Sequence, residues 1–305
     1  MKKLLPLKET GIFYKKLANQ TGSVFGTKRK MGEPTVLVSQ FPGIGYFLYL
    51  CGFITTMENP KNRLEVCLTP AIYPKHADDN NIVVIVDVLR ATSSICAAIH
   101  NGVKNLIPVA TVDEARAMKQ QGYLVASERD GYVLDFADFG NSPFNFVPEI
   151  VSGKDIVYST TNGTRCIHLA SHSKAVVIGA FLNITVLSDW LIQQNAPVLI
   201  FCASWKDRFS LEDTVCAGAL AERLLNSGKF ETICDAVTAS IDLWNMAKPD
   251  LTGYIQKAAQ KTRLASKGLD DCIEYCLTND LCPVIPAFQD EKLVDILKTE
   301  NQQPR

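Results

Sequence analysis

From residue 64 onward, short apolar runs alternate with longer stretches that mix apolar and polar residues. Short runs rich in β-branched residues are typical of strands that are buried on both faces of a sheet. Strands of this kind separated by helices indicate an α/β fold, with a mostly parallel sheet covered on both sides. The predicted strands are residues 63–68, 82–88, 105–109, 124–127, 155–159, 175–179 and 198–202, and the predicted helices are residues 93–101, 112–121, 163–170, 183–194 and 212–227.

The last third of the chain has a different pattern. Residues 234–279 are predicted to be helical, with only short strand-like pieces near residues 282–286. These helices would either cover the sheet or form the interface of a homo-oligomer.

The strand predicted at residues 82–88 ends in a cluster of polar residues. Asp87 interrupts the apolar run, and Arg90, Thr92 and Ser93 follow where a helix begins. An ionised carboxylate at a buried strand end costs free energy unless it is paired or coordinated, so a satisfied helix cap is the weaker explanation. Open α/β sheets bind ligands at the carboxyl ends of their strands. A carboxylate beside free helix N–H groups suits a phosphate and a divalent metal ion.

A second polar turn follows the strand predicted at residues 155–159. Its asparagine–glycine pair permits a tight turn with positive φ. Its hydroxyl groups and exposed amides would form a cradle for an anion, without the glycine spacing of a Walker-type loop. An ordinary helix-capping turn is the alternative. The residues of this turn are Thr160, Thr161, Asn162, Gly163, Thr164 and Arg165.

Glu128 lies just beyond the buried strand predicted at residues 124–127. Together with Asp87 it would supply oxygen ligands for Mg²⁺, which usually takes one or two carboxylates and keeps several waters. The neighbouring Arg129 is a candidate clamp for an anion. A surface turn with a local ion pair is the alternative explanation of this segment.

Two further polar residues are candidates for the same site. Asn141 lies in a segment that is a loop by composition, and it would either contact a ligand or build an Asx-turn. Asp213 follows Ser210 with the spacing of a capping box. It would therefore cap the following helix, contribute to the metal site or act as a base.

Composition excludes several classes of protein. Of the 305 residues, 47% are hydrophobic and 21% are charged, which is ordinary for a soluble globular chain. The net charge of −1 gives no support for a nucleic-acid surface. The ten cysteines are scattered without a CxxC pair, and there are only four histidines. Buried free thiols in a reducing cytoplasm are therefore expected, rather than disulfides or a metal framework.

The first 56 residues differ from the rest of the chain. Up to residue 30 they carry eight basic residues and one acidic residue. An apolar patch at residues 44–54 is short for a membrane span, contains two glycines and lies too far along the chain for a signal peptide. We expect residues 1–56 to be an extension outside the catalytic fold, residues 57–305 to form the functional domain, and the membrane not to be a partner.

Six segments together, in their order and spacing, resemble the 2-phosphosulfolactate phosphatases of the ComB type. The resemblance covers about residues 64–288, and the ordered set is far more specific than any one motif. The segments are Asp87-Val88-Leu89-Arg90-Ala91-Thr92-Ser93, Ser127-Glu128-Arg129, Gly140-Asn141-Ser142-Pro143, Thr160-Thr161-Asn162-Gly163-Thr164-Arg165, Phe181-Leu182-Asn183 and Leu211-Glu212-Asp213.

The resemblance implies a three-layer α/β/α fold and Mg²⁺-dependent hydrolysis of 2-phospho-3-sulfolactate to sulfolactate and phosphate. In methanogens this step belongs to coenzyme M biosynthesis. The substrate is a small polyanion. Direct attack by water is favoured, because position 89 is leucine where a haloacid-dehalogenase pattern would have a second aspartate.

The expected roles divide between metal and anion binding. The expected catalytic residues are Asp87, Arg90, Glu128 and Asp213, of which Asp87, Glu128 and Asp213 would hold the metal. The expected anion-binding residues are Thr92, Ser93, Arg129, Asn141, Thr160, Thr161, Asn162, Gly163, Thr164, Arg165 and Asn183.

The chain departs from the family pattern at two places within the domain. Residues 202–206 replace a loop that usually contains glycine, and Gln260 stands where the family often has a histidine before Arg263. These departures keep two alternatives open. One is a phosphatase of another small phosphorylated hydroxy acid, and the other is a non-catalytic anion-binding protein on the same fold.

Overall fold

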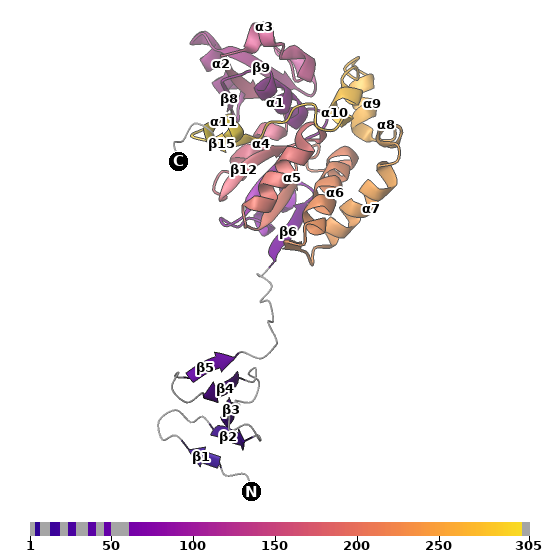
Figure 1. Ribbon diagram of the computed structural model, residues 1–305. Helices are drawn as coiled ribbons and strands as arrows, with labels where there is room; N and C mark the ends of the chain where they lie inside the picture. The colour runs from indigo at the N-terminus through magenta and orange to yellow at the C-terminus, as the bar shows by residue number, and fades with distance from the viewer. Residues whose placement is uncertain are drawn as a thin grey trace. The chain divides into compact units, whose positions relative to one another are not determined.

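The computed structural model describes residues 61–300 and five short strands that precede them (Figure 1). The chain divides into two units, Met1–Pro60 and Lys61–Arg305. The predicted extension at residues 1–56 lies largely outside the described residues and stays a prediction. The strands of the first unit pair antiparallel in sequential order, and they are β1 (Leu4–Pro6), β2 (Phe13–Ala18), β3 (Val24–Lys28), β4 (Val36–Gln40) and β5 (Tyr46–Tyr49).

The second unit contains a sheet of eleven strands in the order β10-β9-β11-β8-β16-β15-β12-β7-β13-β6-β14. Neighbouring strands are parallel from β9 to β8, and again from β12 to β14. The strands are β6 (Asn62–Cys67), β7 (Ile82–Val86), β8 (Asn105–Pro108), β9 (Leu124–Arg129), β10 (Tyr132–Val133), β11 (Asp155–Ser159), β12 (Ala175–Gly179), β13 (Val198–Cys202), β14 (Phe230–Glu231), β15 (Pro286–Gln289) and β16 (Lys292–Asp295).

Helices cover both faces of this sheet (Figure 1). The predicted strands and the predicted helices of the first two thirds agree with the structure to within two residues at each end. The helices are α1 (Ala91–His100), α2 (Val112–Gln120), α3 (Pro148–Val151), α4 (Gly163–Leu169), α5 (Ile184–Gln193), α6 (Leu211–Asn226), α7 (Asp235–Ala247), α8 (Leu251–Ile255), α9 (Ala259–Ala265), α10 (Ile273–Leu277) and α11 (Ile296–Glu300), with 3₁₀ turns η1 (Pro70–Lys75), η2 (Pro143–Asn145) and η3 (Phe181–Asn183).

Strand β7 shows why its sequence is apolar at every position. Its residues Ile82, Val84 and Val86 pack into one core cluster with α5, α6 and α7. Val83 and Ile85 pack into a second cluster with α1 and α4. A strand that is buried on both faces has no solvent side, so its sequence does not alternate. The predicted three-layer α/β/α fold with a mostly parallel sheet is confirmed.

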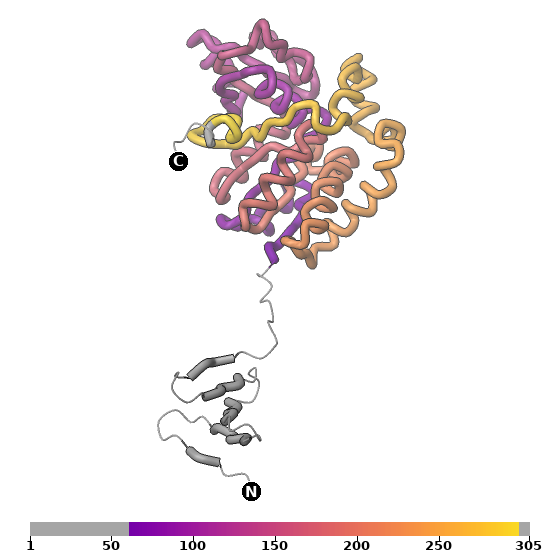
Figure 2. Tube along the Cα trace, viewed as in Figure 1, coloured from indigo at the N-terminus to yellow at the C-terminus, as the bar shows by residue number. Residues whose placement is uncertain are grey.

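An antiparallel hairpin joins the two parallel groups of strands. β15 pairs with β12 through Val177 and Ala287, and β16 pairs with β8 through Leu106 and Leu293. Figure 2 shows this C-terminal segment in yellow, beside segments from the first half of the chain. Its two-residue turn, Asp290–Glu291, has positive φ at both positions. Such turns are normally marked by Asn-Gly or Asp-Gly. Because this turn has neither pair, the hairpin was not predicted from the sequence.

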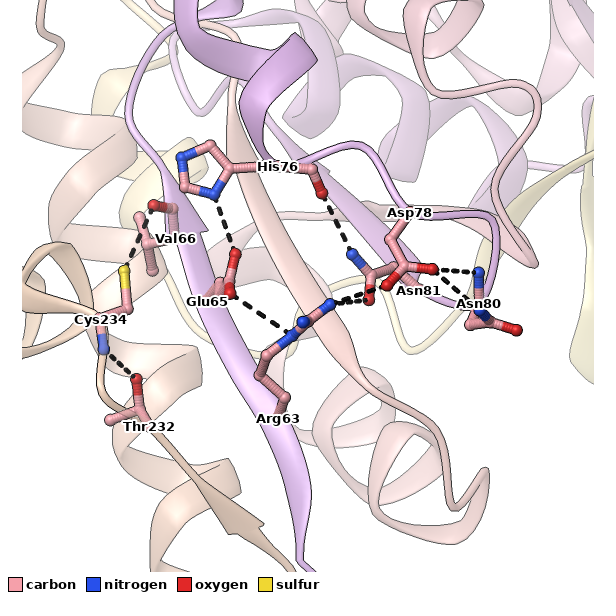
Figure 3. Close-up of polar contacts among 9 residues, drawn as sticks. All are labelled: Arg63, Glu65, Val66, His76, Asp78, Asn80, Asn81, Thr232 and Cys234. Carbon is pink, nitrogen blue, oxygen red and sulfur yellow. Dashed lines mark hydrogen bonds and ion pairs between the residues drawn. The ribbon is translucent and has the colours of Figure 1, made fainter.

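Charged side chains hold the connection between β6 and β7 (Figure 3). Glu65 on β6 lies 2.9 Å from Nδ1 of His76, and Arg63 lies 2.9 Å from the carboxylate of Asp78. Arg63 also pairs with Glu65 at 3.4 Å. These contacts tie the segment after η1 to strand β6. In the part of the chain that the structure describes, no helix is long and apolar enough to cross a membrane.

Helices α6 and α7 approach each other closely at Gly218. A Cβ atom at this position would overlap the backbone carbonyl of Ser240 on α7. The absence of a side chain therefore permits the contact that places α6, whose first turn carries Glu212 and Asp213.

Replacing Gly218 with alanine should force α6 and α7 apart and lower the free energy of unfolding by about 1–3 kcal/mol or more. Urea denaturation measures the change. Arg223→Ala, at an exposed position of the same helix, is the matched control and should stay within about 0.5 kcal/mol of the unsubstituted protein. Equal stability of Gly218→Ala and the control would contradict this role of the glycine.

Candidate active site

A small cavity lies at the carboxyl ends of β7, β9 and β11. Its wall includes Asp87 and Arg90 after β7, Glu128 at the end of β9, and residues 160–162 after β11. Its volume is about 70 Å³, and one water molecule needs about 10–15 Å³ on the same measure, so the cavity has room for several waters. Asn141 also reaches this wall. The structure therefore brings together seven of the residues that the sequence predicted for a site.

The meeting of these strand ends depends on how the sheet bends. β7 and β11 are five positions apart in the strand order, which would separate them by about 24 Å in a flat sheet. Nevertheless, the hydroxyl of Tyr158 on β11 donates to the carbonyl of Ala91 at 3.2 Å, and both residues belong to one core cluster. The two groups of strands thus curve around α1 and face each other, and the cavity lies between their ends.

The turn after β7 is held by its own hydroxyl groups. The backbone N–H of Asp87 donates to Oγ1 of Thr92 at 3.0 Å, and Oγ of Ser93 donates to the carbonyl of Val88 at 2.8 Å. Both hydroxyl residues are fully buried. Their contacts shape the turn that presents Asp87, and they are not part of the cavity wall.

The carboxyl group of Asp87 lies in an unfavourable place for a negative charge. Burial, together with the charges of Glu128 and Glu212, raises its pKa to about 7. The N–H of Ala91, which donates to Oδ1 at 3.3 Å, and the charge of Arg90 oppose that shift. Asp87 is therefore only partly ionised at neutral pH unless a further positive charge approaches it.

Glu128 organises the second turn. Its Oε1 accepts hydrogen bonds from the N–H of Thr161 at 2.9 Å and from the hydroxyl of Thr161 at 3.1 Å. Its Oε2 accepts from the N–H of Gly131 at 2.6 Å. One carboxylate thus orients the turn after β11 and the turn after β9, while it also lines the cavity.

The turn after β11 packs directly against the turn after β7. A Cβ atom on Gly163 would lie 2.7 Å from Cβ of Ala91 and 3.4 Å from Oδ2 of Asp87. Thr160 and Thr164 stabilise the turn through reciprocal contacts, including a 3.1 Å hydrogen bond from the Thr164 hydroxyl to the carbonyl of Thr160. The predicted cradle therefore has a wall of backbone and hydroxyl groups close to the Asp87 carboxylate.

Asp213 bridges two backbone segments near the cavity. Its Oδ1 accepts from the N–H of Val88 at 2.9 Å, and its Oδ2 accepts from the N–H of Ser204 at 3.1 Å. Burial and the charges of Glu212 and Asp87 raise the pKa of Asp213 well above its usual range. Both oxygens are used by backbone groups, and Asp213 does not line the cavity. Its contacts tie the end of β7 to the loop after β13.

Asn183 lies away from the cavity and is fully buried. Its Nδ2 donates to the carbonyls of Ile178 and Val284, each at 3.0 Å. Its Oδ1 accepts from the N–H of Ala180 at 3.0 Å. These contacts satisfy the amide inside the protein and join β12 to the segment before β15, so the structure does not bring Asn183 to the predicted anion site.

Two predicted anion clamps face a different, more open groove that shares Thr160 and Thr161 with the cavity. Arg129 donates to Oγ of Ser159 at 2.9 Å and to two backbone carbonyls. Arg165 pairs with Asp207 at 3.2 Å. The structure therefore separates both arginines from the cavity wall.

Arg90 remains at the cavity and also reaches α10. Its Nη1 donates to the carbonyl of Leu269 at 3.3 Å and lies 3.9 Å from Sγ of Cys272. A hydrogen bond with Cys276, followed by the charge of Arg90, lowers the pKa of Cys272 to about 6, although burial opposes the shift. Arg90 is thus held between the strand end and the helical last third.

Sequence reasoning missed part of the cavity wall, because it searched the ends of strands. Arg263 and Lys267 come from α9 and the residues just after it, and Trp205 comes from the loop after β13. The family pattern around Gln260 and Arg263 was the available signal for this wall. Asp130, after β9, is a further polar residue of the wall that was missed.

The cavity offers only part of the magnesium site that the sequence predicts. Within the described residues, no group of three or more His, Cys, Asp or Glu side chains is arranged to hold a metal ion. Asp87 and Glu128 nevertheless supply two carboxylates to one polar cavity, and Mg²⁺ commonly takes its other ligands from water and substrate. Asp213 fits less well, because it does not line the cavity, whereas Asp87 and Glu128 do.

Comparison with known proteins agrees with this arrangement of motifs. The sequence model of the 2-phosphosulpholactate phosphatase family matches residues 67–291. The chain belongs to this family. The sequence-based assignment to it, and with it to the phosphoric monoester hydrolases, is therefore confirmed. All of the cavity residues lie within the matched range.

Relatives in this family extend over most of the second unit. A probable 2-phosphosulfolactate phosphatase of Thermotoga maritima is 36% identical over 205 residues, 67% of this chain and 88% of the relative. Proteins with the same name from Caldanaerobacter subterraneus and Clostridium novyi are 34% and 33% identical. They match 68% and 70% of this chain, and 87% and 92% of their own lengths.

Gly163→Ala should disturb the contact between the two turns, because the added methyl group would collide with Ala91. We expect the free energy of unfolding to fall by about 1–3 kcal/mol, measured by urea denaturation. Ala91→Gly in the same chain removes the colliding atom and should recover part of the loss in a double-mutant cycle. Strict additivity of the two substitutions would show that the turns do not meet at this point.

Proposed function

We propose that this protein is a Mg²⁺-dependent phosphatase that hydrolyses the phosphate ester of 2-phospho-3-sulfolactate to sulfolactate and phosphate. One observation carries the proposal. Two carboxylates, an arginine and a turn rich in hydroxyl and N–H groups meet in one small cavity, within the range that matches the phosphatase family. The names of the relatives support the choice of substrate.

Hydrolysis of phosphate monoesters is extremely slow without a catalyst, so the site must stabilise charge and position the reactants. Arg90 would donate to the phosphoryl oxygens, as guanidinium groups commonly do. Thr160 offers its hydroxyl group at the same wall, whereas the hydroxyl hydrogen of Thr161 is already donated to Glu128. The turn that carries them is already oriented by Glu128, so little reorganisation is needed when the substrate binds.

Asp87 and Glu128 would hold the Mg²⁺, which when bound would polarise the phosphoryl oxygens and lower the pKa of a bound water. We assign Asp213 a positioning role instead, because it anchors the N–H of Val88 next to Asp87. We favour water as the attacking group, since Leu89 leaves no second aspartate in the turn after β7.

The cysteines support a cytoplasmic location, which we also propose. The nine cysteines among the described residues are all free, and eight of them are buried. Free buried thiols are ordinary in reducing compartments.

Purified protein should release inorganic phosphate from 2-phospho-3-sulfolactate in the presence of Mg²⁺ and lose that activity when EDTA removes the ion. A phosphate assay on this substrate, 2-phospholactate and 3-phosphoglycerate measures both properties. Release from another acid alone would favour a phosphatase of different specificity. Tight binding of these compounds without release from any of them would favour a non-catalytic anion-binding protein. Undiminished activity in EDTA would exclude the proposed metal dependence.

Glu128→Gln should lower kcat by roughly 100-fold or more, because it removes a charge from the proposed metal site. The amide oxygen can still accept from Thr161, but the amide NH₂ group would face the N–H of Gly131 and lose that hydrogen bond. Circular dichroism and urea denaturation therefore check that the variant is folded under the assay conditions. Glu149→Gln, at an exposed position of α3, is the matched control and should retain activity. A Glu128→Gln protein that keeps full activity across a Mg²⁺ titration would remove Glu128 from the metal site.

A further inference from the structure

A second group of polar side chains reaches the cavity from the helical last third. Gln260, Arg263 and Lys267 all line its wall. Their spacing of three and four residues places them on one side of α9 and the turn that follows it. None of these three residues has a role in the proposed hydrolysis of the phosphate group.

Arg263 is held in a fixed orientation. Its Nε donates to Oε1 of Gln260 at 2.7 Å, and Nε2 of Gln260 donates to the carbonyl of Leu89 at 2.8 Å. The guanidinium group also lies over the ring of Trp205, 4.3 Å from the ring centre. These contacts use one edge and one face of the guanidinium. Among the described residues, its two terminal Nη atoms donate no hydrogen bond and form no ion pair, so they are available to a ligand.

Lys267 adds a second positive charge at the same wall. Its Nζ donates to the backbone carbonyl of Asp130. The Asp130 carboxylate pairs instead with Lys206, at 2.9 Å from Nζ. Among the residues that the structure describes, Lys267 therefore forms no ion pair. The α9 wall of the cavity, formed by Gln260, Arg263 and Lys267, carries two cations.

We infer that Arg263, assisted by Lys267, binds the second acidic group of a phosphorylated substrate, a sulfonate or a carboxylate. A planar guanidinium with two free Nη atoms suits such a group better than an ammonium ion does. The strand ends then bind the phosphate, and the α9 wall selects substrates that carry an additional negative charge. This inference rests on the proposed phosphatase function and names the part of the site that sets its specificity.

Gln260 acts as a positioning residue within this subsite. It links Arg263 to the carbonyl of Leu89, in the same turn that carries Asp87 and Arg90. This link holds the guanidinium group of Arg263 in a fixed position relative to the phosphate end of the cavity.

The test compares three phosphate esters that differ in the acidic groups they carry besides the phosphate. 2-Phospho-3-sulfolactate has a carboxylate and a sulfonate, 2-phospholactate has only the carboxylate, and isopropyl phosphate has neither. Arg263→Met should raise KM for 2-phospho-3-sulfolactate about 10- to 100-fold, the range for loss of charge-assisted hydrogen bonds. Its kcat/KM for isopropyl phosphate should change by less than about 2-fold. Lys261→Ala, two residues away on the opposite side of the same helix and outside the cavity wall, is the control and should leave all three substrates unaffected.

Two further variants separate binding from folding. Arg263→Lys keeps the charge but loses the planar fork, and it should recover only part of the affinity. Gln260→Ala should raise KM for 2-phospho-3-sulfolactate about 3- to 10-fold, with the same selectivity among substrates. An equal fall in kcat/KM on all three substrates, or no change on any of them, would overturn the inference.

A binding measurement distinguishes failure of the subsite from failure of the phosphatase proposal. If the protein releases phosphate from none of the compounds, calorimetry with 3-sulfolactate still reports on Arg263. Binding by the unsubstituted protein that is lost in Arg263→Met supports the subsite without the activity. Absence of binding by the unsubstituted protein overturns the subsite.

Discussion

The site depends on the contact between Gly163 and Ala91. These residues begin the helices that follow β11 and β7, and they touch because position 163 has no side chain. The hydrogen bond from Tyr158 to the carbonyl of Ala91 reinforces the same junction from inside the core. Two strand ends that are distant in the strand order thereby share one cavity, and every polar group of the wall takes its place relative to this junction.

The buried acidic residues near the cavity differ in the contacts that their carboxyl groups make. Glu128 and Asp213 both accept hydrogen bonds from backbone N–H groups and so connect loops to one another. Oδ2 of Asp87 instead points toward the turn after β11 and accepts no hydrogen bond from the described residues. Asp87, Glu212 and Asp213 all have raised pKa values because burial disfavours their charged forms, and repulsion from neighbouring acids adds to the shift at Asp87 and Asp213. The positive charge of Arg90 acts to lower the pKa of Asp87, and that of Arg263 acts to lower the pKa of Glu212, so both offset part of that cost.

The loops and the last third of the chain explain where sequence reasoning and structure differ. Asn183 and Arg129 have the residue types of anion ligands, but their hydrogen-bonding groups are used inside the protein. The hairpin of β15 and β16 has a turn without glycine, so its pairing partners were invisible to pattern reading. Arg263 and Lys267 reach the site through long-range packing of α9, which hydrophobic periodicity does not encode.

The sequence by itself determined the α/β class, the bounds of most strands and helices, the family, and the two turns that carry Asp87 and Thr160–Thr164. These features follow from local periodicity and from the ordered motifs, which are properties of short segments. Only the tertiary structure decided that the sheet curves around α1, that Asp213 serves the backbone, and that α9 supplies cations to the cavity. Those outcomes depend on contacts between residues that are far apart in the chain, where packing and burial decide which polar groups remain available.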